Sequence, residues 1–290
     1  MRLREPGGAF RPPVDGVPCA PMKTFDPHKR ADPGLREGRE LDRIAEAALC
    51  AARVLMETGA RTQVVHEDCS RIAHGLGAEH VDLRSGYASL DITITRGTNS
   101  VTRMEEVGPH GVNYRLTYAI RELAQRISRG GMTPAEALSE MTRLKQDTRQ
   151  HSTWMVASAV GIACAAFGRL LGMDWAAFIP VAGCAAVGQT VRECLLRRGA
   201  NVFVVAACVA FLASTLTALA ARWAGSTTLN LAMIASVLLL VPGVPAFDAQ
   251  HDILDGHPTL GTARAVVVGM LLIFIATGVL IARVVLGVRQ

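Results

Sequence analysis

The side chains best suited to proton and carboxylate chemistry gather near the C-terminal end, directly after a run of helix-breaking residues. An apolar stretch ends in the run Val241-Pro242-Gly243-Val244-Pro245. Proline lacks an amide donor and clashes with the preceding turn, and glycine adds backbone freedom, so a helix entering this run must break. The residues that follow include six groups able to carry charge: Asp248, His251, Asp252, Asp255, His257 and Arg264.

Two of these groups are the predicted proton carriers. Histidine titrates near neutral pH and burial raises the proton affinity of a carboxylate, which favours Asp252 and His257. Arg264 could pair with Asp252 or hold a substrate carboxylate. If a helix restarts near Phe247 or Asp248, Asp248 and Asp252 share one face, being four residues apart. The predicted substrate or ion pathway comprises Pro242, Gly243, Pro245, Asp248, Asp252, Asp255, His257 and Arg264.

A simpler interpretation of the same segment is a solvated loop between two membrane helices. Charged loops of this kind are common. Two observations favour a site: the segment follows the break directly, and it holds three of the five acidic residues in 152–290. Ionisable groups at membrane depth are costly to maintain, and broken helices with such groups are typical of transporter sites.

A sharp change in composition near His151 predicts which parts of the chain are soluble and which cross the membrane. Residues 1–151 contain 22 Lys and Arg and 20 Asp and Glu, whereas residues 152–290 contain 8 and 5. The first part is typical of a soluble domain and the second of membrane helices. We therefore predict an α-helical polytopic membrane protein with an N-terminal α+β domain.

The membrane part is predicted to form five spans, because a helix needs roughly 17–25 apolar residues to cross a bilayer. Small residues are frequent in these spans, which favours a tight bundle or an oligomer. Three polar residues inside the spans, Gln189, Asn230 and Ser236, are candidates for hydrogen bonds between helices or for substrate contact. The spans are expected at about 152–172, 175–191, 201–221, 228–247 (broken at Pro242–Pro245) and 265–286.

The preceding 150 residues divide into a tail and a folded domain. Residues 1–38 are rich in Pro, Gly and Arg and are predicted to be a disordered tail. Residues 39–150 are predicted to form the α+β domain, ending in a helix that a Thr133–Glu136 capping box begins. The expected elements are helices at 40–58 and 62–75, strands at 80–84, 90–95 and 100–104, and helices near 116–127 and from 134 on. The first helix has one apolar face, the second should turn Val65, Cys69, Ile72 and Leu76 to the core, and residues 90–95 alternate between apolar and polar side chains.

Several classes of function are disfavoured by the absence of their motifs. His66 and His74 could share one side of a helix, but there is no HExxH pair, and solvated helix edges are the favoured interpretation. The seven cysteines include no CxxC pair, which argues against a zinc site or a disulfide framework. No phosphate loop, dinucleotide fingerprint or nucleophile elbow occurs. We expect no metal, no cofactor, no catalytic residues and no nucleic-acid partner.

The distribution of arginine in short loops predicts the orientation in the membrane. One side carries Arg143, Lys145, Arg149, Arg192, Arg197, Arg198 and Arg264. The other carries Arg169, Arg222, Arg283 and Arg289. This bias places the N-terminal domain and the polar segment in the cytoplasm, with residues 1–32 lacking the apolar core of a signal peptide.

Residues in both halves resemble the threonine/serine exporter family. In the second half the resemblance rests on Leu240-Val241-Pro242-Gly243, Pro245, Asp252, Gly256-His257, Gly261 and Arg264. In the first half it rests on Gly59-Ala60-Arg61-Thr62-Gln63-Val64, on Val81-Asp82 and on the strand containing Thr93. It covers residues 40–288. Two features depart from the pattern: Asp248 stands where asparagine is expected, and Ala246-Phe247 replaces a more aliphatic pair.

The resemblance implies a secondary exporter of small hydrophilic acids in a bacterial inner membrane. A chain ending after five spans resembles the large subunit of a split system, which implies a small five-span partner subunit of the same family, in a homo- or hetero-oligomer. The implied substrates are threonine and serine or dicarboxylates such as succinate, with export driven by the proton gradient. The alternatives are a membrane-anchored enzyme with a catalytic soluble domain and a non-transporting assembly or sensor protein.

Overall fold

The computed structural model describes residues 33–108, 111–148 and 152–288. Their contacts divide them into two compact units. An α+β unit contains residues 33–148 together with 247–264, and a helical unit contains 152–246 together with 265–288. The segment 247–264, expected in the membrane part, therefore packs as part of the α+β unit.

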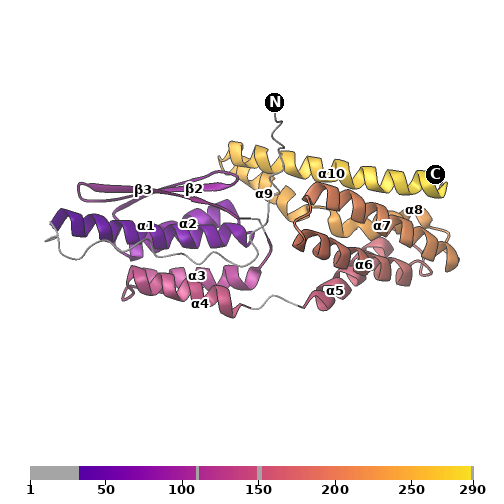
Figure 1. Ribbon diagram of the computed structural model, residues 1–290, viewed down its shortest axis with the longest axis horizontal. Coiled ribbons are helices and arrows are strands. Elements are labelled where there is room, and N and C mark those ends of the chain that lie inside the picture. Colours follow the sequence, from indigo (N-terminus) through magenta and orange to yellow (C-terminus); the bar gives the residue numbers. More distant parts are fainter. Residues whose placement is uncertain (1–32, 109–110, 149–151, 289–290) are drawn as a thin grey trace, which may run out of the picture. The chain divides into compact units, whose positions relative to one another are not determined.

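The α+β unit has three layers, which Figure 1 shows edge-on as a sheet, a middle layer of helices α1 and α2, and an outer layer of α3 and α4. The seven elements follow the order expected from the sequence. Their bounds are α1 Pro33–Glu57, α2 Thr62–Gly75, β1 His80–Ser85, β2 Ser89–Arg96, β3 Asn99–Glu106, α3 Tyr114–Ser128 and α4 Pro134–Asp147.

Helix α1 is the centre of this unit. An apolar stripe on one face was expected, but small residues on the other faces, such as Ala47 and Ala51, are also fully buried. This burial follows because the sheet covers one side of α1 while α3 and α4 cover another. The helix also begins at Pro33 rather than near Glu40, so the last six residues of the expected tail are helical. The rest of the predicted tail, residues 1–32, lies outside the described residues.

The sheet is an antiparallel meander in the order β1-β2-β3. Its central strand pairs Ile92 with Leu83 on one side and with Arg103 on the other. Leu90, Ile92 and Ile94 are fully buried toward the helices. This confirms the alternation predicted for residues 90–95, since successive side chains of a strand point to opposite faces.

The helix starts in this unit follow local capping chemistry. Thr133 accepts a hydrogen bond from the Glu136 amide, and the Glu136 carboxylate accepts one from the Thr133 amide, which confirms the predicted capping box. Helix α2 spans the predicted range and buries Val65, Cys69 and Ile72 as expected. The Cys69 thiol is so deeply buried that its pKa rises to about 12, so it acts as an apolar core residue.

The second unit is built of helices alone. Its elements are α5 Thr153–Leu170, α6 Phe178–Arg197, α7 Val202–Trp223, α8 Leu229–Val237 and the 3₁₀ turn η1 Leu238–Leu240. Two further helices, α9 Gly243–Leu254 and α10 Pro258–Leu286, contribute to both units. Gly161 of α5 packs so closely on α6 that a Cβ added there would lie 2.3 Å from the Ala182 carbonyl oxygen. This contact illustrates the tight packing that the small residues predicted.

Within the described residues, three helices are long and apolar enough to cross a membrane: α5, α7 and α10. A fourth span arises if the residues 229–240 and helix α9, which are bent by 61° at a short break, count as one. Helix α6 has the length of a span but is less apolar, because Arg192, Glu193 and Arg197 lie in its last turns. The protein is thus a mostly helical membrane protein with a small sheet, and five spans remain a prediction.

The predicted break is present, with two differences in its bounds. The helix ends at Leu240 and restarts at Gly243, so Pro245 lies in the first turn of α9 rather than in the break. The last long helix begins at Pro258, seven residues before the expected start at Ala265. Proline is favoured at the first helical position, where its missing amide proton is not needed. Arg264 therefore lies inside α10 and not in a loop.

Candidate functional site

The turn between α9 and α10 brings the two halves of the predicted site together. Gly256 adopts φ +87°, a conformation that side chains disfavour, and it ends α9. The His257 amide then donates to the Asp252 carbonyl oxygen at 2.7 Å, and α10 starts at the next residue. Gly261 lets the helices approach, since a Cβ there would lie 2.7 Å from the Ala249 carbonyl oxygen. Asp252 lies one turn after Ala249 on α9, and Arg264 lies one turn after Gly261 on α10, so the two side chains meet.

Asp252 and Arg264 form a buried ion pair, as the sequence suggested. Arg264 Nη1 donates to Asp252 Oδ2 at 2.5 Å, and the exposed fractions of the Arg264 and Asp252 side chains are 8% and 4%. Removing two charges from water costs several kcal/mol for each ion, which the attraction between them must offset. The pair is therefore stable only while both members keep their charge.

A residue of the α+β domain completes the environment of Arg264. Arg264 Nη1 also donates to Thr62 Oγ1 at 3.3 Å, a contact between residues 202 positions apart. Thr62 is the first residue of α2 and is 2% exposed. Both hydrogen bonds use Nη1, so within the described part of the chain the donors on Nε and Nη2 have no partner. The sequence pattern predicted this helix start at Thr62, and the family resemblance includes it, but neither gave Thr62 a role in the site.

The second predicted proton carrier, His257, lies against another residue of α2. The rings of His257 and His66 are 5.0 Å apart, and His66 Nε2 lies 2.8 Å from Ser85 Oγ. Burial lowers the pKa of His66, and His257 lowers it further, while Asp82 and Asp252 act in the opposite direction. His66 was expected on a solvated helix edge, but it is half-buried next to the predicted site.

The remaining predicted residues of this segment are less enclosed. Asp248 lies on α9 one turn before Asp252 and is half-buried, whereas Asp255 is exposed. His251 Nδ1 lies 2.9 Å from the Phe247 carbonyl oxygen within the same helix. Pro242 and Gly243 lie at the break and Pro245 in the first turn after it. The structure therefore brings Asp252, His257 and Arg264 together and leaves Asp255 outside.

Comparison with known proteins settles the family. The family model described as "Putative threonine/serine exporter" matches residues 46–286, which include both α2 and the α9–α10 turn. The chain belongs to the threonine/serine exporter family. Membership supports the membrane assignment and the interpretation of the protein as an exporter rather than an enzyme.

Curated relatives of this exporter cover nearly its whole length. A protein of Klebsiella aerogenes named "Probable succinate transporter subunit YjjP" is 26% identical over 247 residues, covering 85% of this chain and 95% of its own. The protein of the same name from Escherichia coli K12 is 26% identical over 236 residues, covering 81% and 91%. An uncharacterized protein of Haemophilus influenzae is 21% identical over 132 residues, 46% of this chain and 44% of its own. No solved structure matches significantly.

The three polar residues predicted inside the spans of the exporter belong to its helical unit. Gln189 Nε2 donates to Glu193 Oε1 at 3.1 Å, and Ser236 Oγ donates to the Met233 carbonyl oxygen at 2.8 Å. Each of these bonds joins residues of the same helix, so neither is the bond between helices that was one of the two expectations. Asn230 Oδ1 is buried and has no partner among the described residues.

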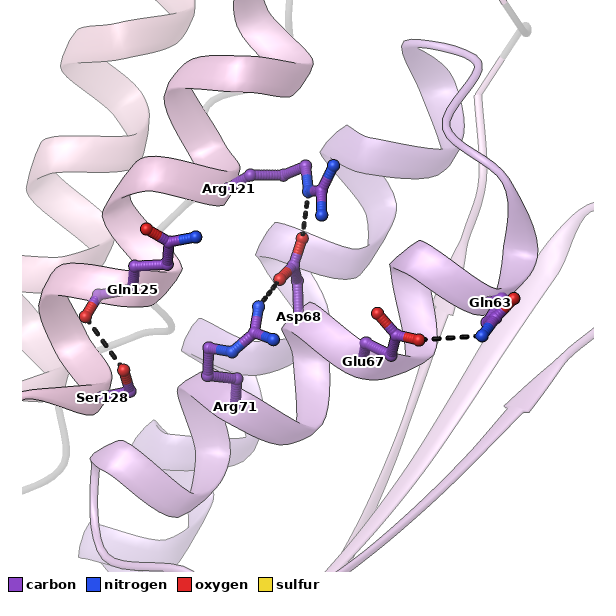
Figure 2. Close-up of polar contacts among 7 residues, drawn as sticks. All are labelled: Gln63, Glu67, Asp68, Arg71, Arg121, Gln125 and Ser128. Carbon is purple, nitrogen blue, oxygen red and sulfur yellow. Dashed lines mark hydrogen bonds and ion pairs between the residues drawn. The ribbon is translucent and has the colours of Figure 1, made fainter.

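A second buried carboxylate, in the α+β domain, is part of the framework that positions α2. Asp68 is fully buried, and Figure 2 shows Arg71 of α2 and Arg121 of α3 pointing toward it. Arg121 Nε donates to Asp68 Oδ2 at 3.1 Å, and Arg71 Nη1 pairs with Oδ1. Burial raises the pKa of the Asp68 carboxyl, and the two arginines offset part of that rise. The cluster joins α2 to α3 and thereby fixes the helix that carries Thr62 and His66.

We expect Asp68→Ala to lower the free energy of unfolding by about 2 kcal/mol, because the charge-assisted hydrogen bonds of the cluster that joins α2 to α3 are lost while the two partly exposed arginines regain hydration. The measurement is thermal or denaturant unfolding of the full-length protein in detergent. Glu67→Ala is the matched control: Glu67 is the preceding residue, it is exposed, and it accepts a bond from Gln63 (Figure 2). We expect that change to be within about 0.5 kcal/mol of wild type. Equal stability of the two variants would show that the cluster does not hold α2 in place.

The described part of the chain holds no group of three or more His, Cys, Asp or Glu side chains arranged to bind a metal ion. His66 and His74 lie on the same helix but have different partners: His74 Nδ1 lies 2.9 Å from the Ala78 carbonyl oxygen. His74 is exposed, as expected for a solvated helix edge, whereas His66 is half-buried against His257.

Proposed function

We propose that this chain is one subunit of a proton-coupled exporter of small carboxylates. Membership of the exporter family supports the direction of transport. The names of the Klebsiella and Escherichia relatives support two further points, an assembly of more than one subunit and succinate as the first substrate to test. The second subunit we propose is a small five-span protein of the same family.

One observation carries this proposal: the buried guanidinium of Arg264 is paired with a single carboxylate and keeps free donors. Asp252 and Thr62 occupy Nη1, while the N–H groups of Nε and Nη2 have no partner in the described part of the chain. An arginine fork with two parallel donors matches the two oxygens of a carboxylate. A substrate carboxylate can therefore bind the Nε and Nη2 edge of Arg264 and compete with Asp252 for its positive charge.

Coupling to protons follows from this competition. When a substrate carboxylate takes over Arg264, Asp252 is left buried beside another anion, which favours the uptake of a proton. His257 and His66 lie next to the pair and provide a route for that proton. In this scheme a dicarboxylate and a proton leave together, so the outward gradient of the substrate drives export. This differs from the export driven by the proton gradient that the family resemblance implies.

A zwitterionic amino acid would use the same pair differently. Its carboxylate would bind Arg264 and its ammonium group would bind Asp252, so Asp252 would need no proton. Threonine and serine, the substrates in the family's description, are therefore the second class to test. Movement of protons with the substrate distinguishes the two classes.

We further propose five spans with the α+β domain in the cytoplasm. Residues 175–191, which include the first part of α6, are uncharged and would serve as the second span. The arginine bias of the loops supports the orientation. Labelling of a cysteine engineered at Asn99, in the β2–β3 hairpin, by a membrane-impermeant reagent applied to intact cells would contradict it.

The test is export by cells that lack their own exporters and produce this chain with its five-span partner. We expect succinate, threonine or serine to accumulate outside faster than in cells with the partner alone. Arg264→Lys should abolish the effect, because lysine offers a point charge instead of a fork. If no member of this panel leaves faster, or if Arg264→Lys exports as wild type does, the proposal is wrong.

A further inference from the structure

Thr62 accepts a hydrogen bond from Arg264, the residue that binds the substrate carboxylate in the proposed function. It comes from the α+β domain, to which the sequence pattern gave no part in transport. Its Oγ1 accepts from Nη1 of Arg264, the same nitrogen that binds Asp252. With both protons of Nη1 occupied, the guanidinium plane is fixed and its Nε and Nη2 edge is left for a ligand.

The chemistry of the two partners differs in a way that matters during transport. Asp252 is charged and, in the proposed mechanism, gives up Arg264 when substrate binds. Thr62 is neutral, so its bond to Arg264 neither depends on a proton nor competes with an anion for charge. Thr62 is also buried and lies in the first turn of a helix whose position the Asp68 cluster fixes.

From this geometry we propose that Thr62 is a positioning residue of the exporter: it keeps Arg264 oriented toward the substrate carboxylate while Asp252 is released. The inference rests on the proposed function and adds that helix α2, which is remote in sequence from the α9–α10 segment, provides part of the substrate site. Arginine has several rotatable bonds, and a side chain that is held in its binding conformation loses less entropy when ligand arrives.

Three variants in the complete complex, reconstituted in vesicles, test this role. Thr62→Val has a similar shape but no acceptor, Thr62→Ser keeps the acceptor, and Gln63→Ala changes the exposed neighbouring residue. For Thr62→Val we expect the KM for succinate efflux to rise about tenfold, which corresponds to one hydrogen bond to a charged group. The maximal rate should stay close to that of wild type. Thr62→Ser and Gln63→Ala should keep the KM of wild type.

A purely structural role for Thr62 gives different results. If Thr62→Val has the KM of wild type, the inference is overturned, whether or not the melting temperature and the maximal rate fall. Should the valine variant fail to assemble, the KM of Thr62→Ala decides in the same way. Arg264→Lys in the same vesicles separates the two proposals: its loss of export together with a normal Thr62→Val refutes only the role of Thr62.

Discussion

Asp252→Asn is expected to abolish net export of succinate while leaving exchange of internal for external succinate intact. Asparagine keeps the shape of the side chain but cannot take up a proton, and it leaves the charge of buried Arg264 unneutralised. Substrate can still bind Arg264 and be exchanged. The empty carrier, however, holds an unpaired charge and cannot return. The measurement compares efflux from loaded vesicles into buffer without and with external succinate.

Because the Asp252–Arg264 pair is buried, Asp252→Asn should also change the stability of the protein. Removing one partner of a buried ion pair costs about 3–5 kcal/mol, so Asp252→Asn should also lower the melting temperature of the protein without substrate. Saturating succinate should restore part of it. The double variant Asp252→Asn/Arg264→Gln should be more stable than Asp252→Asn alone, yet inactive in both assays. Net efflux at the wild-type rate from Asp252→Asn would show that this carboxylate is not part of the transport site.

The second large effect is expected for Gly261→Ala. A Cβ at this position would lie 2.7 Å from the Ala249 carbonyl oxygen and 2.6 Å from Ile253 Cγ1, so α9 and α10 must move apart. Gly261 and Ala249 each lie three residues before the members of the ion pair, which would separate with the helices. We expect export to fall about tenfold or more, since a displacement of about 1 Å disrupts a preorganised site.

Gly269→Ala provides the control for Gly261→Ala, because it lies on the same helix and a Cβ there would meet nothing within 4 Å. Export by Gly269→Ala should match that of wild type, since alanine is a better helix former than glycine. If Gly261→Ala exports at the wild-type rate, the close approach of α9 and α10 is not required for transport.

Local patterns were sufficient to predict much of the fold. Helix α2 has the predicted bounds, the strand at Leu90 to Thr95 has the predicted alternation, and Thr133 and Glu136 form the predicted cap. Each of these depends on residues a few positions apart. Predictions from apolar content alone are less accurate: the apolar run predicts a last helix that starts at Ala265, whereas the helix begins at Pro258.

The site was predicted in part, for a related reason. Asp252 and Arg264 are twelve residues apart, and their opposite charges and short separation are enough to suggest a pair. Their burial was not visible, because it depends on the packing of residues 247–264 with the α+β domain. Thr62 and His66 could not be assigned from spacing, since their partners lie about two hundred positions along the chain.

The pH inside succinate-loaded vesicles tests the central claim most directly. The vesicles contain the wild-type complex, an internal pH dye and an outward succinate gradient. If Asp252 takes up a proton whenever succinate holds Arg264, the internal pH should rise as succinate leaves, and it should not rise in vesicles containing Arg264→Lys. Succinate efflux at an unchanged internal pH, or with acidification inside, would contradict transport of proton and carboxylate together through the Asp252–Arg264 pair.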